Sequence, residues 1–275
     1  MTILPTVKIK NIEVTRLIIG GNPFSGFSHQ SNQVDEEMMD FYSTERIKET
    51  LLYAQSLGIN TFAARGDRHI LRVLRECANE GKLKLQWICQ TVPELGDFKN
   101  MIGAIVSSKY KPVAIYHHGG HADRLYLEGK MDVLKDNLKI MRDTGFLVGL
   151  ASHIPEVIKE CEDAGLDIDF YMACFYNLTG RGKKGLTVFS GSEGEVFDDE
   201  DPVKMCQVIR EVPKTCIAYK ILGAGRKAKN SDELVNSFKF AFQNIKVNDC
   251  VCVGVFQKYK DQLKENVEIV RKILA

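Results

Sequence analysis

From residue 16 onward, short apolar runs alternate with longer segments in which apolar residues recur every three or four positions. Runs of the first kind are typical of buried parallel strands, and segments of the second kind are typical of helices with one buried face. The predicted strands occupy residues 16–22, 59–64, 83–90, 113–117, 146–151, 168–175, 215–221 and 249–254. The helices predicted to follow them occupy residues 44–57, 69–79, 97–108, 131–144, 154–164, 202–212, 232–244 and 258–274.

Strands and helices that alternate in this way predict a parallel sheet with helical crossovers, which belongs to the α/β class. Eight strand–helix units within 275 residues close into a (β/α)8 TIM barrel more readily than they form an open sheet. Ahead of these units, residues 6–15 predict two short strands joined by a tight turn at Asn11. No linker separates the units, so we expect one domain over residues 1–275.

In a barrel of this kind the chemistry lies at the carboxyl ends of the strands. Polar or ionisable residues occupy almost all of these positions. In chain order they are Asn22, Arg65, Asp67, Gln90, His117, His118, Ser152, His153, Tyr176, Asn177 and Lys220. We therefore expect a small-molecule site at this end, with Asn22, Arg65, Gln90, Tyr176 and Asn177 as the substrate-binding residues.

Three of the six histidines fall within the sequence YHHGGH, where the fourth strand ends in a glycine-rich turn. Alternate residues of a strand face opposite sides. The β-branched Val113 and Ile115 share a side with His117 and suit packing under the helices. The opposite side carries Ala114, Tyr116 and His118. The alternation favours His118 as the histidine that points into the barrel, with His121 in the loop beyond it.

The same alternation predicts the inward faces of strands five and seven. On strand five, the small residues Gly149 and Ala151 share a face with His153, and small residues suit a crowded barrel axis. On strand seven, the predicted inward residues are Cys216, Ala218 and Lys220.

Histidines at neighbouring strand ends indicate one candidate chemistry, which is metal-assisted. His118 and His153 end adjacent strands and, with His29 from the loop after strand one, could hold a divalent ion such as Zn, Mn or Fe. His121 or Asp67 is an alternative third ligand. An ion with an open position would activate a water or a hydroxyl group.

The same residues fit a metal-free site. In that interpretation His118 is the catalytic acid or base, and Asp67 is a further catalytic candidate. Lys220 then pairs with a substrate anion, acts as a base or forms a Schiff base. Arg65 suits a carboxylate or a phosphate on the substrate.

Two predicted connections are longer than the fold needs, residues 23–42 and residues 178–201. The second is rich in glycine, basic at its start and acidic towards its end. It is consistent with a lid whose Arg181 and lysines meet an anionic ligand, and equally with an ordinary surface excursion.

Composition narrows the partners and the compartment. The formal net charge is +1, so no bulk field recruits nucleic acid or an anionic membrane. No segment has the roughly 18 consecutive apolar residues that span a bilayer, and MTILPTVKIK lacks the apolar core of a secretory signal. The eight cysteines lie in apolar runs without a CxxC pair, as expected of buried residues in a reducing compartment. We expect a cytoplasmic protein that acts on a small molecule.

Three segments resemble the aldo-keto reductase family, and together they cover nearly the whole chain. VKIKNIEVTRLIIGGNPF is similar to that family's N-terminal hairpin and first strand, and LGINTFAARGD is similar to its second strand. QLKENVEIVRKIL resembles its last helix. The resemblance implies a hairpin that caps the bottom of the barrel and an NADP-binding groove in which Glu265 and Asn266 hold the adenine.

The family's catalytic Asp, Tyr, Lys and His are only partly matched. Ala63 stands at the position of the aspartate, no tyrosine follows in ARGDRHIL, and Gln90 stands at the position of the lysine. Only the histidine is matched, by His117 or His118. The residues at the positions that hold the 2′-phosphate in many members are Phe256, Gln257 and Gln262. Because carbonyl reduction needs a proton donor with a tuned pKa, the resemblance implies a retained scaffold with altered chemistry.

Three functions fit these observations. The first is a lyase, isomerase or hydrolase with histidine-centred acid/base chemistry, with or without a divalent metal, on a polar or anionic substrate. The second is an NADP-dependent oxidoreductase in which a histidine replaces the tyrosine of the proton relay. The third is a barrel that binds a ligand without catalysis, but the ring of ionisable residues at the strand ends favours an enzyme.

Overall fold

A computed structural model describes residues 4–179 and 195–275. The strands of its barrel are β3 (Leu17–Gly20), β4 (Thr61–Arg65), β5 (Gln86–Gln90), β6 (Ala114–His117), β7 (Leu147–Ser152), β8 (Phe170–Cys174), β9 (Thr215–Tyr219) and β10 (Cys250–Gly254). All neighbouring pairs are parallel, and the sheet closes in the order β10-β3-β4-β5-β6-β7-β8-β9. The predicted (β/α)8 TIM barrel is confirmed.

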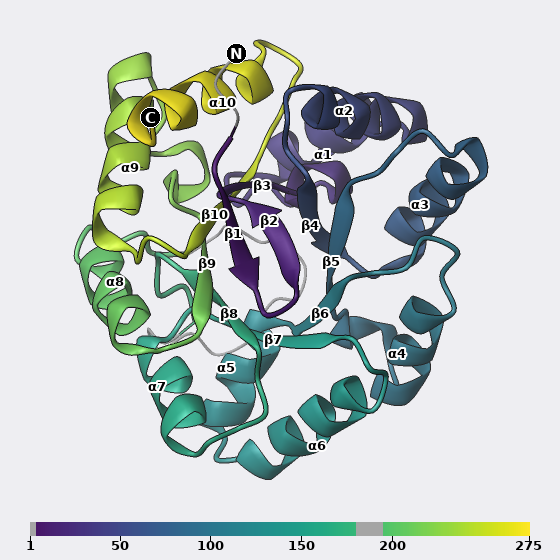
Figure 1. Ribbon diagram of the computed structural model, residues 1–275, viewed down its shortest axis with the longest axis vertical. Coiled ribbons are helices and arrows are strands. Elements are labelled where there is room, and N and C mark those ends of the chain that lie inside the picture. The colour runs from purple at the N-terminus through teal and green to yellow at the C-terminus, as the bar shows by residue number, and fades with distance from the viewer. Residues whose placement is uncertain (1–3, 180–194) are drawn as a thin grey trace.

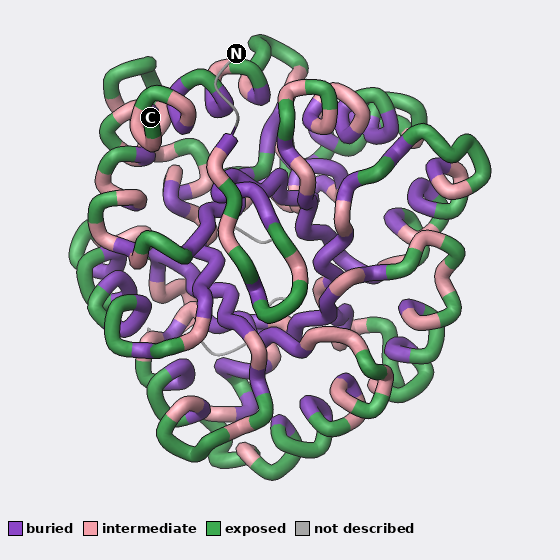
Figure 2. The backbone as a smooth tube through the Cα atoms, in the orientation of Figure 1, coloured by how far each residue is buried: buried purple, intermediate pink, exposed green. Residues whose placement is uncertain are grey.

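Helices surround the strands, as Figure 1 shows in a view along the barrel. They are α1 (Asn32–Phe41), α2 (Thr44–Ser56), α3 (Arg68–Glu80), α4 (Phe98–Val106), α5 (Gly119–Leu127), α6 (Met131–Arg142), α7 (Pro155–Asp163), α8 (Asp201–Glu211), α9 (Ser231–Asn244) and α10 (Gln262–Ile273). Short 3-10 turns lie at η1 (Asn22–Ser25), η2 (Pro93–Leu95) and η3 (Gly223–Gly225). The inner faces of the α-helices are buried against the sheet, and their outer faces are exposed (Figure 2).

A hairpin covers the amino ends of the barrel strands. It consists of β1 (Thr6–Ile9) and β2 (Ile12–Thr15), which pair antiparallel as predicted. Ile9 and Val14 are fully buried and belong to the cluster of side chains inside the barrel. The hairpin lies across the near end of the barrel in Figure 1, so the carboxyl ends of the strands open on the far side.

Two helices occupy segments that the sequence pattern predicted to be loops. The connection after the first barrel strand contains α1, whose N-cap Ser31 accepts a hydrogen bond from the Val34 amide. The glycine-rich turn predicted after the fourth barrel strand is the first turn of α5, capped by His118, so His121 lies in a helix. Glycine has low helix propensity, and here the cap and the buried inner face of α5 outweigh it.

Large side chains fill the axis of the barrel. On β7, Ala151 faces inward as predicted, and the ring of Phe170 occupies the space that a side chain at Gly149 would need. The prediction for strand seven is wrong, because Ile217 and Tyr219 face the interior. Cys216 and Ala218 pack instead on the helix side. Their small size reflects close packing under the helices rather than a place on the axis.

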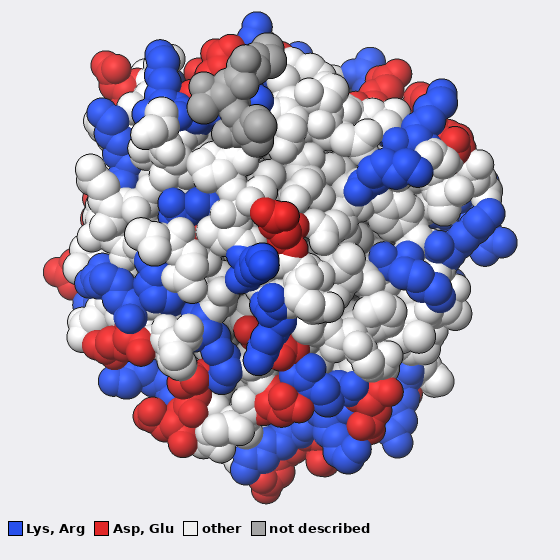
Figure 3. Space-filling model, in the orientation of Figure 1, with Lys and Arg blue, Asp and Glu red and all other residues white. Residues whose placement is uncertain are grey.

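The cysteines and the charged surface residues are placed as the composition predicted. All eight cysteines are free and buried. On the hairpin face, charged side chains of both signs are interspersed (Figure 3). Within the described ranges, no helix has the length and apolar character needed to cross a membrane.

Candidate active site

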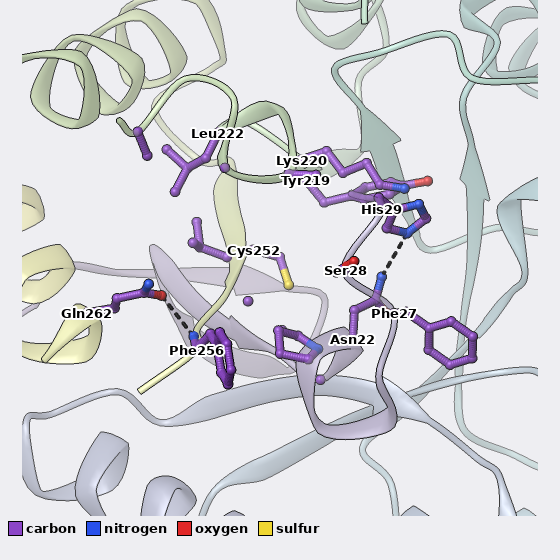
Figure 4. A pocket seen from close by; sticks show the side chains of 18 of the residues that line it. Asn22, Phe27, Ser28, His29, Tyr219, Lys220, Leu222, Cys252, Phe256 and Gln262 are labelled. Carbon is purple, nitrogen blue, oxygen red and sulfur yellow. Dashed lines mark hydrogen bonds between the residues drawn. The ribbon is translucent and has the colours of Figure 1, made fainter. Parts of the chain in front are cut away.

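An elongated cavity of about 460 Å3 opens at the carboxyl ends of the strands. Its inner end lies inside the barrel, between Tyr116 and Tyr219, and its outer end reaches Gln262, Glu265 and Asn266 on α10. In Figure 4, Tyr219 and Lys220 extend beside His29 at one end, while Phe256 and Gln262 lie towards the other. The volume is within the range of small-molecule and cofactor sites.

Three side chains at the inner end form a hydrogen-bonded chain. The Nδ1 atom of His153 lies 2.8 Å from Oδ2 of Asp123. The Nε2 atom of His153 lies 3.2 Å from the hydroxyl oxygen of Tyr219, whose side chain lines the cavity. A carboxylate, an imidazole and a hydroxyl in this order can pass a proton to or from a bound molecule.

The carboxyl group of Asp123 is fully buried and is surrounded by hydrogen-bond donors. It accepts hydrogen bonds from the hydroxyls of Ser152 at 2.5 Å and Thr179 at 2.7 Å, and from the backbone amide of His153. So many donors leave the carboxylate as an acceptor only. We therefore assign the Nδ1 proton to His153, which leaves its Nε2 lone pair facing the Tyr219 hydroxyl.

Burial sets the protonation of the tyrosine. It raises the pKa of Tyr219 well above the ordinary value, and Cys174 and Asp123 raise it further. In the absence of a ligand the Tyr219 hydroxyl is therefore protonated at neutral pH, and it donates a hydrogen bond to the Nε2 lone pair of His153. In this state the tyrosine can receive a proton from a ligand hydroxyl while it passes its own to His153.

A second polar cluster lies beside the relay at the rim of the cavity. Nδ1 of His29 lies 3.0 Å from the carboxylate of Glu195, and its Nε2 lies 3.5 Å from the amide nitrogen of Asn22. Burial, followed by the charge of Lys220, lowers the pKa of His29. Burial alone would raise the pKa of Glu195, but the hydrogen bond from His29 and the charge of Lys220 hold it below its usual range.

Lys220 reaches the cavity by an unusual backbone turn. It directly follows β9 and has a φ of 56°, a left-handed conformation that costs energy for a non-glycine residue. The turn lets Lys220 and Tyr219 line the same cavity although they are neighbours in sequence. Alternation along the strand therefore misassigned Tyr219, while Lys220 lines the cavity as predicted.

The cavity brings together half of the residues singled out from the sequence. Its lining includes Asn22, His29, Gln90, Lys220, Glu265 and Asn266. The remaining predicted residues lie outside this lining: Arg65, Asp67, His118, His153, Tyr176 and Asn177. Of these, His153 touches the cavity only through Tyr219.

Arg65 and Asp67 are engaged with each other rather than with the cavity. Nε of Arg65 lies 3.2 Å from Oδ2 of Asp67, and its Nη2 pairs with Glu94. The other carboxylate oxygen of Asp67 accepts the Ile70 amide as the N-cap of α3. Both side chains are thus used in local ion pairs and hydrogen bonds. For this reason neither is available to bind a molecule in the cavity.

The two adjacent histidines have different roles. As the alternation predicted, His117 packs under the helices, stacked between Phe98 and His121, with its Nε2 3.3 Å from the amide nitrogen of Asn137. His118 caps α5, and its Nδ1 accepts the backbone amide of His121. Burial and the charge of Arg65 lower the pKa of His118 well below its ordinary value, so it is neutral.

The predicted residues of strand six and the last helix are placed as follows. Tyr176 is buried against Phe197, and Asn177 lines a separate pocket of about 210 Å3 with His153 and Cys174. Glu265 pairs with Lys260 at 2.7 Å. The central part of the predicted lid, including Arg181, lies outside the described residues.

The three predicted metal ligands do not converge. Both nitrogens of His153 are used by Asp123 and Tyr219, and His29 is paired with Glu195. Within residues 4–179 and 195–275, no group of three His, Cys, Asp or Glu side chains is arranged to hold an ion. This donor set therefore does not fit the proposed metal centre.

No family model and no curated protein matches the chain in sequence. A protein from Pseudomonas aeruginosa proposed to be an aldo-keto reductase superposes with a TM-score of 0.62 at 15% identity, over 98% of this chain and 94% of that one. An aldo-keto reductase from Bacillus halodurans in its holo form gives 0.58 at 11% identity, over 98% and 91%. A truncated 3-deoxy-D-arabino-heptulosonate 7-phosphate synthase from Thermotoga maritima gives 0.56 at 12%, over 99% and 91%. These similarities show that the chain shares the (β/α)8 barrel fold of these enzymes.

Two members of the relay were missed by the interpretation of the sequence. Tyr219 was assigned to the helix side of its strand because it precedes Lys220. Asp123 was not singled out from the sequence; it lies on α5 with its side chain turned towards β7. The signal that could have found Tyr219 is the alternation Ile217–Tyr219, had large residues been placed on the axis.

Proposed function

We propose that this protein is an oxidoreductase that interconverts a carbonyl group and an alcohol, with Tyr219 exchanging the proton and a nicotinamide dinucleotide exchanging the hydride. The observation that carries the proposal is one cavity that joins Tyr219 to the start of α10. A small substrate at the inner end would meet the relay, and a larger cofactor would occupy the outer part. The fold similarity is compatible with this function and does not by itself specify it.

The relay can accept the substrate proton in alcohol oxidation and return it in carbonyl reduction. In alcohol oxidation, Tyr219 accepts the substrate hydroxyl proton as it passes its own to Nε2 of His153, and Asp123 stabilises the resulting imidazolium. In carbonyl reduction the same steps run backwards, and the new hydroxyl takes its proton from Tyr219. A relay of this kind compensates for Ala63 and Gln90, which leave no proton donor at the positions of the family's tetrad.

Residues along the cavity fit a dinucleotide. The ring of Tyr219 lines the inner end, and the 70% exposed ring of Tyr259 offers a second flat face at the outer end. Lys260, Gln262 and Asn266 supply polar and positively charged groups between the cavity and α10. When bound, a reduced nicotinamide would supply the hydride, and the chain would bind and orient it and exclude water.

A second candidate is a metal-free isomerase or lyase that moves protons without a redox cofactor. The observation that favours it is the His29–Glu195 pair, which faces the same cavity as the relay. Because its pKa is lowered, His29 is neutral and could take a proton from carbon while Tyr219 donates one to oxygen. This candidate keeps the histidine-centred chemistry expected from the sequence, with His153 and His29 in place of His118.

Cofactor binding separates the two candidates. Titration of the protein with NADPH and with NADH, followed by cofactor fluorescence, should give saturable binding that weakens in Gln262→Ala and Asn266→Ala. Binding should persist in Tyr219→Phe, whereas aldehyde-dependent oxidation of the cofactor should be lost in that variant. No binding of either nucleotide at millimolar concentration would refute the oxidoreductase and leave the isomerase or lyase.

A further inference from the structure

The first residue of α5, Gly119, is buried directly against the relay. A Cβ atom added to it would lie 3.2 Å from Cε1 of His153, 3.2 Å from the hydroxyl oxygen of Tyr219 and 3.3 Å from Cβ of Ala151. A carbon atom in ordinary van der Waals contact lies about 3.5–4.0 Å from its neighbours. Any side chain at this position would therefore press on both rings of the relay.

The backbone does not itself require a glycine at this position. Gly119 is part of the helix and does not have a positive φ, so other residues could adopt its conformation. Glycine is also among the least favourable residues in a helix, and alanine is the most favourable. The close approach of α5 to the relay is the feature of the structure that accounts for a glycine here.

One face of α5 holds the imidazole of His153 at two points. Residues four apart lie one above the other on a helix, so Gly119 and Asp123 share a face. Asp123 binds Nδ1, and Gly119 lies against Cε1, the ring carbon between the two nitrogens. The start of the helix is fixed, because the His118 amide donates to the buried hydroxyl of Thr91 at 2.9 Å. An added side chain would therefore displace the rings rather than the helix.

We propose that Gly119 is a positioning residue of the relay, whose missing side chain lets Tyr219 and His153 come within hydrogen-bond distance. Their bond of 3.2 Å is already at the upper end of the usual range, so a shift of a few tenths of an ångström would weaken it. Proton transfer would then slow. Binding in the cavity would not change, because Gly119 does not line it. The inference rests on the proposed function for its effect on turnover, but not for its effect on the hydrogen bond.

The first test compares Gly119→Ala with Gly103→Ala in the intact protein. Gly103 lies in α4 and has open space around the Cβ atom that it would gain, so it is the matched control. Gly119→Ala should lower kcat for aldehyde-dependent oxidation of the cofactor about 10–100-fold, with KM and cofactor affinity near the wild-type values. Gly103→Ala should keep the wild-type kcat. A wild-type kcat in Gly119→Ala would overturn the positioning role.

The second test repeats the substitution in Tyr219→Phe. The hydroxyl that the new Cβ atom would meet is then absent, so Gly119→Ala should cause little further loss of turnover. A loss as large as in the wild type would show that the alanine acts elsewhere, which overturns the proposal. If Gly119→Ala alone does not fold, the double variant should fold. Failure of both to fold would assign Gly119 to the packing of the barrel instead.

The third test reads the hydrogen bond without turnover, by nitrogen NMR of the isotopically labelled histidines. The Nε2 resonance of His153, assigned by its loss in His153→Gln, should move in Gly119→Ala in the same direction as in Tyr219→Phe. This shift in a protein that oxidises no cofactor supports the positioning role and counts against the oxidoreductase. Turnover in the wild type, with an unchanged resonance and kcat in Gly119→Ala, overturns the positioning role and leaves the oxidoreductase standing.

Discussion

The hydroxyl of Tyr219 and Nε2 of His153 lie 3.2 Å apart, with their ring planes at 70° to each other. An edge-on approach of this kind directs the tyrosine hydroxyl along the lone pair of the imidazole rather than over its face. The tyrosine is thereby fixed in one orientation before any ligand enters. The predictions that follow ask what this pair and its neighbours contribute.

Tyr219→Phe should lower turnover about 10²–10⁴-fold, because it removes the group that exchanges a proton with the substrate. Cofactor binding should change little, since the aromatic ring remains. Steady-state kinetics and fluorescence titration measure the two effects separately. Tyr171→Phe is the matched control, because the Tyr171 hydroxyl bonds to Glu162 away from the cavity. If Tyr219→Phe turns over at the wild-type rate, the relay is not the proton donor.

Asp123→Asn should also reduce turnover, by about 10²–10⁴-fold, because an amide can no longer stabilise the charged form of His153. A merely destabilised protein would lose activity only in proportion to its unfolded fraction, which thermal unfolding of Asp123→Asn measures. Thr179→Val removes only one of the donors to the carboxylate and should give a smaller loss of the same kind. Wild-type turnover in folded Asp123→Asn would contradict the assigned role.

His117 should make the fold sensitive to acid. Burial lowers its pKa to about 3, whereas an exposed histidine in the unfolded chain has a pKa of about 6.5. The unfolded state therefore binds a proton that the native state does not, and stability falls as the pH drops from about 6.5 towards 3. At pH 5 this group alone removes ~2 kcal/mol from the free energy of unfolding.

His117→Gln should flatten that dependence, since glutamine keeps an acceptor for Asn137 and does not titrate. Urea unfolding of both proteins between pH 8 and pH 4.5 measures the difference. The other buried histidines are present in both proteins and cancel in the comparison. Parallel curves over the whole range would show that His117 is already protonated in the native state.

Arg65→Met should destabilise the fold by about 1–3 kcal/mol, because it leaves the half-buried carboxylates of Asp67 and Glu94 without the buried cation that pairs with them. Adding Glu94→Gln should recover part of that loss, since one of the stranded charges is then removed. Chemical unfolding measures both effects. The KM of the folded single variant should stay near the wild-type value, and a large rise in KM alone would instead assign Arg65 to the substrate.

The architecture was predictable from the sequence because each barrel unit repeats the same two periodicities. Even so, the helix-forming contacts of α1 and α5 are not visible in a pattern, since Ser31 and His118 act as caps only once the backbone is folded. Local polarity alone assigned both segments to loops.

The candidate site was predictable as a place and only partly as a set of residues. Asn22, Gln90, Lys220 and His29 line the cavity because strand ends converge at one end of a barrel. Asp123 escaped notice because its partner is 30 residues away and is met only across the α5–β7 interface. Tyr219 was missed because the left-handed turn at Lys220 breaks the alternation of the strand and lets both residues line the cavity.

The relay is assembled from separate parts of the chain: Asp123 on α5, His153 just after β7 and Tyr219 at the end of β9. Asp123 falls in the first half of the chain and the other two in the second, so neither half of the barrel contains a working relay. Turnover by this relay therefore requires that both halves of the barrel are assembled. Two fragments separated between α6 and β7 would each be inactive. The turnover recovered on mixing them would measure the fraction of barrels that had re-formed.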